Sequence, residues 1–344
     1  GPVIFVDPKN GDMIENYAKA HAAKFGDLRD VQIFEVPKVL PAIPFFDIRP
    51  HLYEGMNRDN AIQQKVDEFH LIMQMIDDNY ETAYVAKSVL GALIKSQFDA
   101  RHGADSFTLD DLYDTAVEMY SDQTVPRVSH QPQVRNILTN QLNNAEQDFK
   151  NTMQAVINRL DDLQEDINLY RLFNQNPAWD DDKGEYKYNR VTQAEYEEAK
   201  ESDKKQDPEP PYTALDFREL LDSNKVVLFD TGGFVGDESQ RAFSMYILSA
   251  LWSAVKSRYN DRKSHETIDN TASLIIEEAA PIVSTELVTN TLIPEGREFG
   301  LSLGMVMQFP EQVRKHSDAE TYNEIITNVQ SKIIGQIEPG QRII

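Results

Sequence analysis

The chain has 344 residues, of which 40% are hydrophobic and 26% are charged, and it contains no cysteine. This composition is typical of a folded globular protein, and the lack of cysteine excludes disulfides, thiolate metal sites and cysteine nucleophiles. The formal net charge of −23 argues against broad binding to nucleic acids, because such a surface repels phosphate backbones. No apolar run approaches the roughly 20 residues of a membrane-spanning helix, so we expect a cytoplasmic protein.

The first part of the chain, residues 1–56, follows a β-α-β pattern. An apolar run that ends in Asp7-Pro8-Lys9 predicts a buried strand. Residues 13–25 then predict a helix, and residues 31–36 predict a second strand. We expect this part to belong to an α/β domain that the sequence enters partway, since it begins within a strand.

The second part, residues 57–173, has apolar residues at every third or fourth position, which predicts an all-α insertion. Thr108-Leu109-Asp110-Asp111 resembles a capping box and marks the start of one helix. From Pro132 to Ile167 the periodicity continues without a break, which predicts one helix on the order of 50 Å long. These apolar stripes are typical of a helical core, and we assign them no chemistry.

Residues 174–213 are rich in charged and turn-forming residues, which predicts a linker or an exposed loop. The acidic run Asp180-Asp181-Asp182 within it is better explained as a solvated cluster than as a cation site. The α/β pattern returns in residues 214–344. There we expect strands at 225–230, 272–276, 299–308 and 332–335 and helices at 217–221, 239–259, 281–295 and 322–328.

Polar residues follow three of the expected strands: Asp7-Pro8-Lys9, Glu277 with Glu278, and Gln308. In a parallel sheet these strand ends converge on the edge where ligands bind. For phosphoryl transfer, Glu278 has the position of a base or water-orienting group, Glu277 lies beside the metal, and Gln308 senses the γ-phosphate. The alternative is an acidic turn without chemistry. Arg297 is either an arginine finger for a neighbouring subunit or a surface residue without a role.

The order of these segments resembles the type IV secretion coupling proteins and the HerA- and FtsK-like DNA-translocating ATPases. The resemblance covers residues 1–50 and 215–340. It rests on the Asp-Pro-Lys strand, the all-α insertion, an hhhDxxG strand, the Walker-B-like strand ending in Glu277-Glu278, and the run GREFGLSLGMVMQFP at residues 296–310. It implies a RecA-like P-loop NTPase sheet, α/β in class and incomplete at its N-terminus, with a large all-α insertion. Such proteins assemble as hexamers and move DNA with ATP and Mg²⁺.

The resemblance also assigns roles to single residues. It implies that Glu278, Gln308 and Arg297 act in hydrolysis, that Asp7 and Lys9 contact the nucleotide, and that Glu277 binds the metal. A relaxase or a secretion-channel protein would be a further partner, and an anchor upstream would place the protein at a membrane. The acidic composition leaves two interpretations. The protein is a haloarchaeal version of the family, in which DNA contacts are confined to small basic loops, or DNA is not a partner of this chain.

Two features depart from the family. The acid beside the metal is usually Asp, whereas here it is Glu277. The sequence also contains no GxxxxGK[ST] motif, and Gly232-Gly233 lacks the lysine and hydroxyl that bind phosphates. In the family this loop precedes the Asp-Pro-Lys strand, so we expect a sequence that lacks its N-terminal part and binds ATP with a Kd weaker than millimolar. The alternatives are a degenerate, non-catalytic platform for a DNA-transfer partner, and an unrelated α/β fold.

Overall fold

A computed structural model describes residues 1–9, 12–77, 79–99, 104–128, 131–187, 212–262, 270–283, 285, 287–307, 311–314, 319–329, 331 and 333. A sheet of five parallel strands lies at its centre, in the order β2-β7-β1-β8-β9. These strands are β1 (Val3–Asp7), β2 (Val31–Glu35), β7 (Val226–Asp230), β8 (Ala272–Ile276) and β9 (Leu301–Met305). The expected parallel α/β sheet is therefore confirmed.

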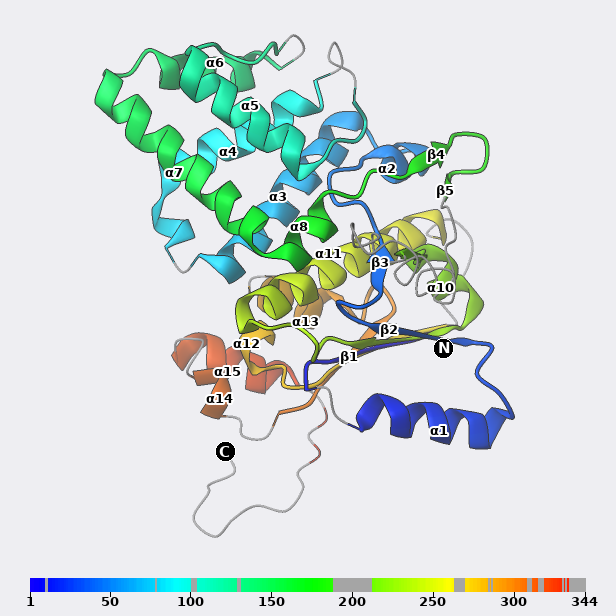
Figure 1. Ribbon diagram of the computed structural model, residues 1–344. Coiled ribbons are helices and arrows are strands. Elements are labelled where there is room, and N and C mark those ends of the chain that lie inside the picture. The colour runs from blue at the N-terminus through cyan, green and yellow to red at the C-terminus, as the bar shows by residue number, and fades with distance from the viewer. Residues whose placement is uncertain are drawn as a thin grey trace, which may run out of the picture.

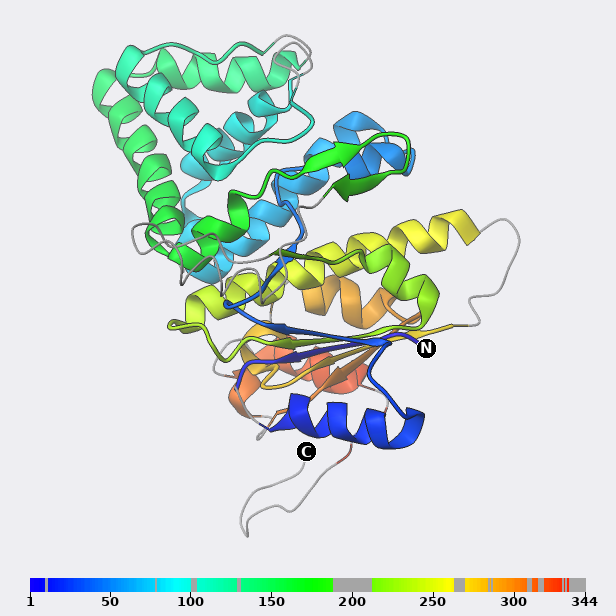
Figure 2. The same cartoon turned by 45° about the vertical axis from the view of Figure 1, so that its right-hand side comes forward.

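Helices cover both faces of this sheet (Figures 1 and 2). The long helix α11 (Asp237–Arg262) crosses one face, and α10 (Phe217–Ser223) packs against it. Helix α1 (Met13–Phe25) lies on the opposite face, where Phe5, Ile14, Val226 and Leu228 form a small separate core. The strands are apolar because both of their faces are covered in this way, as is usual in parallel sheets.

Six helices form a unit that stands above the α11 face of the sheet (Figure 1). They are α3 (Arg58–Ile76), α4 (Tyr84–Gln97), α5 (Leu109–Asp122), α6 (Pro132–Leu142), α7 (Glu146–Glu165) and α8 (Ile167–Phe173). The expected capping box begins α5, since the Thr108 side chain accepts from the Asp111 amide and the Asp111 side chain accepts from the Thr108 amide. Two donors of the first turn are thereby satisfied.

The prediction of one helix from Pro132 to Ile167 was wrong, because the chain breaks twice within it. Ala145 is extended (φ −56°, ψ 140°) between α6 and α7. Asp166 is also extended, and its side chain accepts hydrogen bonds from the amides of Asn168 and Leu169 to begin α8. Apolar residues continue at helical spacing across both breaks, so the periodicity of the sequence gave no sign of them.

Two short strand pairs and several short helices complete the described structure. Two of the strands, β4 (Ala178–Asp180) and β5 (Glu185–Lys187), form a hairpin within the region where a loop was expected. Residues 188–211 and most of the expected strand at 332–335 lie outside the described residues. The other elements are β3 (Leu40–Ala42), which pairs with β6 (Tyr212–Ala214), and α2 (Arg49–Tyr53), η1 (Tyr80–Thr82), α12 (Ala280–Val283), the π-helix η2 (Val288–Leu292), α13 (Ile293–Glu295), α14 (Glu311–Arg314) and α15 (Ala319–Asn328).

The helical unit and the sheet meet along α11. The ring of Phe45 lies 4.8 Å from that of Phe173 and 5.3 Å from that of Tyr246 on α11, measured between centroids. Helix α3 packs along α11, and Gln64 Nε2 donates to Ser253 Oγ at 2.9 Å. This joint fixes the position of α11, whose first turns line the candidate site. In the part of the chain that is described, no helix has the length and apolar character needed to cross a bilayer.

Candidate functional site

The carboxyl ends of neighbouring strands bring a row of acidic residues to one edge of the sheet. Glu35 at the end of β2 is in register with Asp230 at the end of β7, and Asp230 is in register with Asp7 at the end of β1. Glu277 follows the end of β8, which pairs with β1. The sequence pointed to Asp7 and Glu277 here but not to Glu35 and Asp230, although each of these two also ends a strand.

The carboxylates in this row affect one another. Asp7 is almost fully buried (1% exposed), and its Oδ1 accepts a hydrogen bond from the Lys9 amide at 2.9 Å. Burial raises the pKa of Glu277, and the charge of Asp7 raises it further, while Lys9 opposes this shift. Burial is also the main cause of the raised pKa of Asp230, to which the charge of Asp7 adds. Negative charge is therefore crowded at this edge, at a cost in stability.

Glu278 is held in an unusual backbone conformation next to this row. Its φ is +45°, in the left-handed region that residues other than glycine seldom adopt. The Glu277 amide donates to the Val6 carbonyl at 3.0 Å and the Ala279 amide donates to the Val306 carbonyl at 3.1 Å, so the chain is fixed on both sides of it. The Glu278 side chain forms an ion pair with Lys9. Strain of this kind is common at functional sites.

A pocket of about 400 Å³ opens over this edge. The first turns of α11 form one wall, and the ends of β1 and β8 form the other. Gln240 joins the walls, because its Nε2 donates to the carbonyls of Pro8 and Thr231, both at 2.8 Å. The residues lining the pocket are Val6, Pro8, Lys9, Asp237, Gln240, Arg241, Ser244, Glu277, Glu278, Pro281 and Ile282.

Arg241 is the arginine of this pocket, and the sequence did not point to it. Its Nε is buried, and it has no hydrogen bond or ion pair with any residue that the structure describes. A guanidinium is always charged, and although Arg241 is only partly buried as a residue, a buried N–H without an acceptor is costly. In the sequence Arg241 lies in a strongly apolar helix and belongs to no motif. The available signal was its place one turn inside the start of a helix that follows a strand end.

The structure does not place Arg297 in this pocket. Arg297 is exposed in the turn before β9, where its carbonyl accepts from the Gly300 amide. It therefore lies at the amino edge of the sheet, opposite the edge that carries Glu278. Gln308 lies outside the described residues, but β9 ends at Met305 beside β8, and the Val306 amide donates to the Ile276 carbonyl at 2.9 Å.

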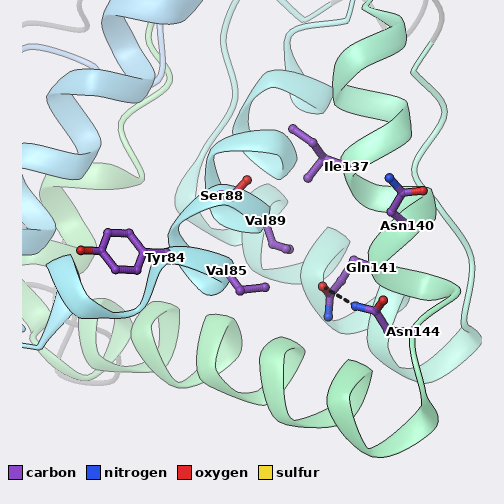
Figure 3. A pocket seen from close by; sticks show the side chains of 8 residues that line it. All are labelled: Tyr84, Val85, Ser88, Val89, Ile137, Asn140, Gln141 and Asn144. Atoms are coloured by element: carbon purple, nitrogen blue, oxygen red, sulfur yellow. Dashed lines mark hydrogen bonds between the residues drawn. The ribbon is translucent and has the colours of Figure 1, made fainter.

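A second pocket, of about 310 Å³, lies between α4 and α6 in the helical unit (Figure 3). Its lining residues Tyr84 and Val85 are exposed, and Gln141 at its base is 4% exposed. The Gln141 Nε2 has no hydrogen-bond partner in the described part of the chain. Each of the labelled residues is uncharged, so this pocket supplies no acid, base or cation. The described residues also contain no group of three or more His, Asp or Glu side chains arranged to hold a metal.

Comparison with solved structures shows that the chain shares its fold with a known protein. No model of a known protein family matches the sequence, and no curated protein matches it either. Among solved structures, the chain is similar to the bacterial conjugative coupling protein TrwBdeltaN70 in its unbound monoclinic form, with a TM-score of 0.52 and 12% sequence identity.

The alignment covers 95% of this chain and 60% of the coupling protein, so the chain spans about 60% of the length of that structure. At this level of identity the likeness shows the fold alone. The segment order in the sequence predicted this fold, and the chain has the α/β, RecA-like fold of a conjugative coupling protein.

Proposed function

We propose that this chain is part of a motor ATPase that couples ATP hydrolysis to DNA translocation or to conjugative DNA transfer. The chain shares its fold with a conjugative coupling protein, and this likeness supports the proposal. The observation that carries it is the meeting of Lys9, Arg241, Glu277 and Glu278 in one pocket at the carboxyl edge of the sheet. Two cations beside two carboxylates are the groups that phosphoryl transfer requires.

The residues of the pocket fit a nucleotide with its metal. The buried Nε of Arg241 lacks an acceptor among the described residues, and a phosphate oxygen would supply one. Glu277 has a raised pKa in a crowded acidic row, and Mg²⁺ beside it would offset the repulsion. The metal would neutralise charge on the phosphate oxygens. Lys9 and Arg241 would hold the terminal phosphate, and Asp7 would keep Lys9 in place through the hydrogen bond to its amide.

Glu278 would orient the attacking water and accept its proton. In the structure the Glu278 carboxylate is paired with Lys9, so it must leave this partner before it acts as a base. The sequence has no GxxxxGK[ST] loop, and the proposal therefore requires that such a loop come from outside these 344 residues. Gln308 would sense the γ-phosphate.

The proposal includes a hexameric ring. Arg297 is exposed at the amino edge of the sheet, away from the pocket of its own chain, and would serve the nucleotide of a neighbouring subunit. With a net charge of −23, contacts to DNA would be confined to small basic loops. A relaxase or a secretion-channel protein would be the further partner.

The test is Glu278→Gln in a longer protein that carries the phosphate loop. We expect hydrolysis to fall by about 100-fold or more with ATP binding preserved, because the amide accepts no proton. Glu298→Gln, a change in the exposed turn before β9, is the control and should have no effect. Turnover that persists in Glu278→Gln would refute the role as base. A parent protein that never hydrolyses ATP would favour the non-catalytic platform.

A further inference from the structure

Arg241 is held in a fixed position at the wall of the pocket. Helix α11 begins at Asp237, and Gln240 ties its first turn to the carbonyls of Pro8 and Thr231. Arg241 is the next residue, so its backbone cannot move without breaking these two hydrogen bonds. The guanidinium lines the same pocket as the carboxylates of Glu277 and Glu278.

The carboxylates of the pocket do not pair with Arg241. Glu278 is instead paired with Lys9, and within the described residues no ion pair joins Arg241 to Glu277 or to Asp237. Because Arg241 does not bond to the carboxylates of its own pocket, the N–H donors of its guanidinium are available to a ligand. The planar fork of a guanidinium matches the oxygens of a phosphate, to which it binds with two parallel hydrogen bonds.

We propose that Arg241 is the main binding residue for a phosphate group in this pocket, and that a phosphate bound there draws Lys9 away from Glu278. This inference rests on the proposed function and adds to it the residue that receives the phosphate. Lys9 is 43% exposed and carries a flexible side chain, whereas Arg241 is anchored through its helix. Arg241 therefore supplies the fixed part of the site, and Lys9 supplies the part that moves.

The exchange of partners at Lys9 involves hydrogen bonds only. In the structure the Lys9 ammonium pairs with Glu278 Oε1. A phosphate oxygen on Arg241 competes for the same ammonium, because an oxyanion with two negative charges attracts it more strongly than a single carboxylate does. Glu278 Oε1 then no longer bonds to Lys9 and can accept a hydrogen bond from water. Phosphate binding in this way removes Lys9 from the group that the proposed function needs as a base.

The first test is a titration of the full 344-residue chain with inorganic phosphate, at constant ionic strength balanced with chloride. The Arg241 Nε–H resonance is assigned by its loss in Arg241→Lys and followed by NMR. We expect this resonance to move and to saturate, because phosphate supplies the missing acceptor. A resonance that does not move, or one that moves equally with chloride, would overturn the proposal.

Three variants test whether phosphate affinity changes in the expected direction. Arg241→Gln should weaken phosphate binding by about tenfold, because it removes a bidentate charged contact. Glu278→Gln should strengthen binding by about threefold, because it removes a negative charge and releases Lys9. Arg29→Gln, in the exposed turn before β2 at the opposite edge, should leave binding unchanged. Equal affinity of the wild type and Arg241→Gln, or weaker binding in Glu278→Gln, would contradict the inference.

Two controls keep these results interpretable. Thermal unfolding shows whether each variant is folded, and Arg241→Lys preserves the charge if Arg241→Gln does not fold. Arg241→Lys should still bind more weakly than the wild type, since a lysine lacks the planar fork. The titration tests the phosphate site independently of the proposed function. If a longer protein does not hydrolyse ATP, the motor proposal fails but the phosphate site remains, whereas a titration without effect removes Arg241 and leaves the motor proposal open.

Discussion

Removing the charge of Asp7 tests whether the acidic residues at this edge of the sheet stabilise the fold or reduce its stability. Asp7→Asn keeps an Oδ1 that accepts from the Lys9 amide, but it removes a buried negative charge. Asp7 and Asp230 are in register on neighbouring strands, and such strands lie about 4.8 Å apart. Two carboxylates roughly 5 to 6 Å apart repel each other by about 3 kcal/mol at an effective dielectric constant near 20. We expect Asp7→Asn to stabilise the chain at pH 7 by up to about this amount.

The effect should depend on pH with a defined sign. Glu277 and Asp230 have raised pKa values in the folded chain. For a carboxyl group this means that protonation favours folding, and that stability is lost as the pH rises through the folded pKa. As the pH falls toward 4, both carboxyls take up protons more readily in the folded chain than in the unfolded chain, so less repulsion is left to relieve. The gain from Asp7→Asn should therefore be smaller at pH 4 than at pH 7.

Urea unfolding followed by tryptophan fluorescence measures this difference, since the chain has two tryptophans. Asp181→Asn, in the exposed turn of the β4–β5 hairpin, is the matched control and should change stability by less than about 0.5 kcal/mol. If Asp7→Asn destabilises the chain at pH 7, or if its effect is the same at both pH values, the charge of Asp7 supports the fold and our reasoning is refuted. A stabilising result would mean that the edge keeps a costly charge, as functional sites often do.

Three other substitutions test separate parts of the structure. Gln141→Leu should stabilise the chain by about 1 kcal/mol in urea unfolding, because it removes a buried amide whose Nε2 has no partner in the described chain; a loss of stability would show that Nε2 is satisfied. Glu278→Gly should raise the melting temperature, since glycine relieves a positive φ worth roughly 1 kcal/mol; a lower melting temperature would show that the side-chain contacts of Glu278, including the ion pair with Lys9, outweigh that strain. Tyr246→Phe removes a hydrogen bond to the Ile43 carbonyl and should cost about 1–3 kcal/mol while phosphate titration stays unchanged; unaltered stability would argue against that bond.

The elements that the sequence predicted best are those with a simple local pattern. Helix α1 was predicted with the bounds it has, Met13–Phe25, because it ends at Gly26, which adopts a left-handed conformation (φ 92°). The strands β1, β7 and β8 were predicted because short apolar runs with polar ends suit a sheet covered on both faces. The position of Asp7 and Glu277 at one edge then followed from parallel pairing alone.

The features that the sequence did not predict depend on contacts between distant residues, or on small differences in backbone energy at single residues. The break at Ala145 changes the chain direction without changing the apolar spacing, so a pattern of periodicity does not detect it. Arg241 became a site residue only when α11 was placed against the end of β8, since its lack of a partner is a property of what surrounds it. A residue that is notable because it lacks a hydrogen-bond partner cannot be recognised from the sequence, since its neighbours in space are not known.

Helix α11 connects the candidate site with the helical unit. Its first turns carry Arg241 into the pocket. Farther along, Tyr246 donates to the carbonyl of Ile43, and Ser253 in the second half of the helix bonds to Gln64 of α3. At 26 residues the helix is about 39 Å long, and a buried helix packed along its length moves as a rigid body. The contacts along α11 therefore also hold Arg241 in place at the pocket, so the proposed phosphate site keeps a fixed donor while Lys9 moves.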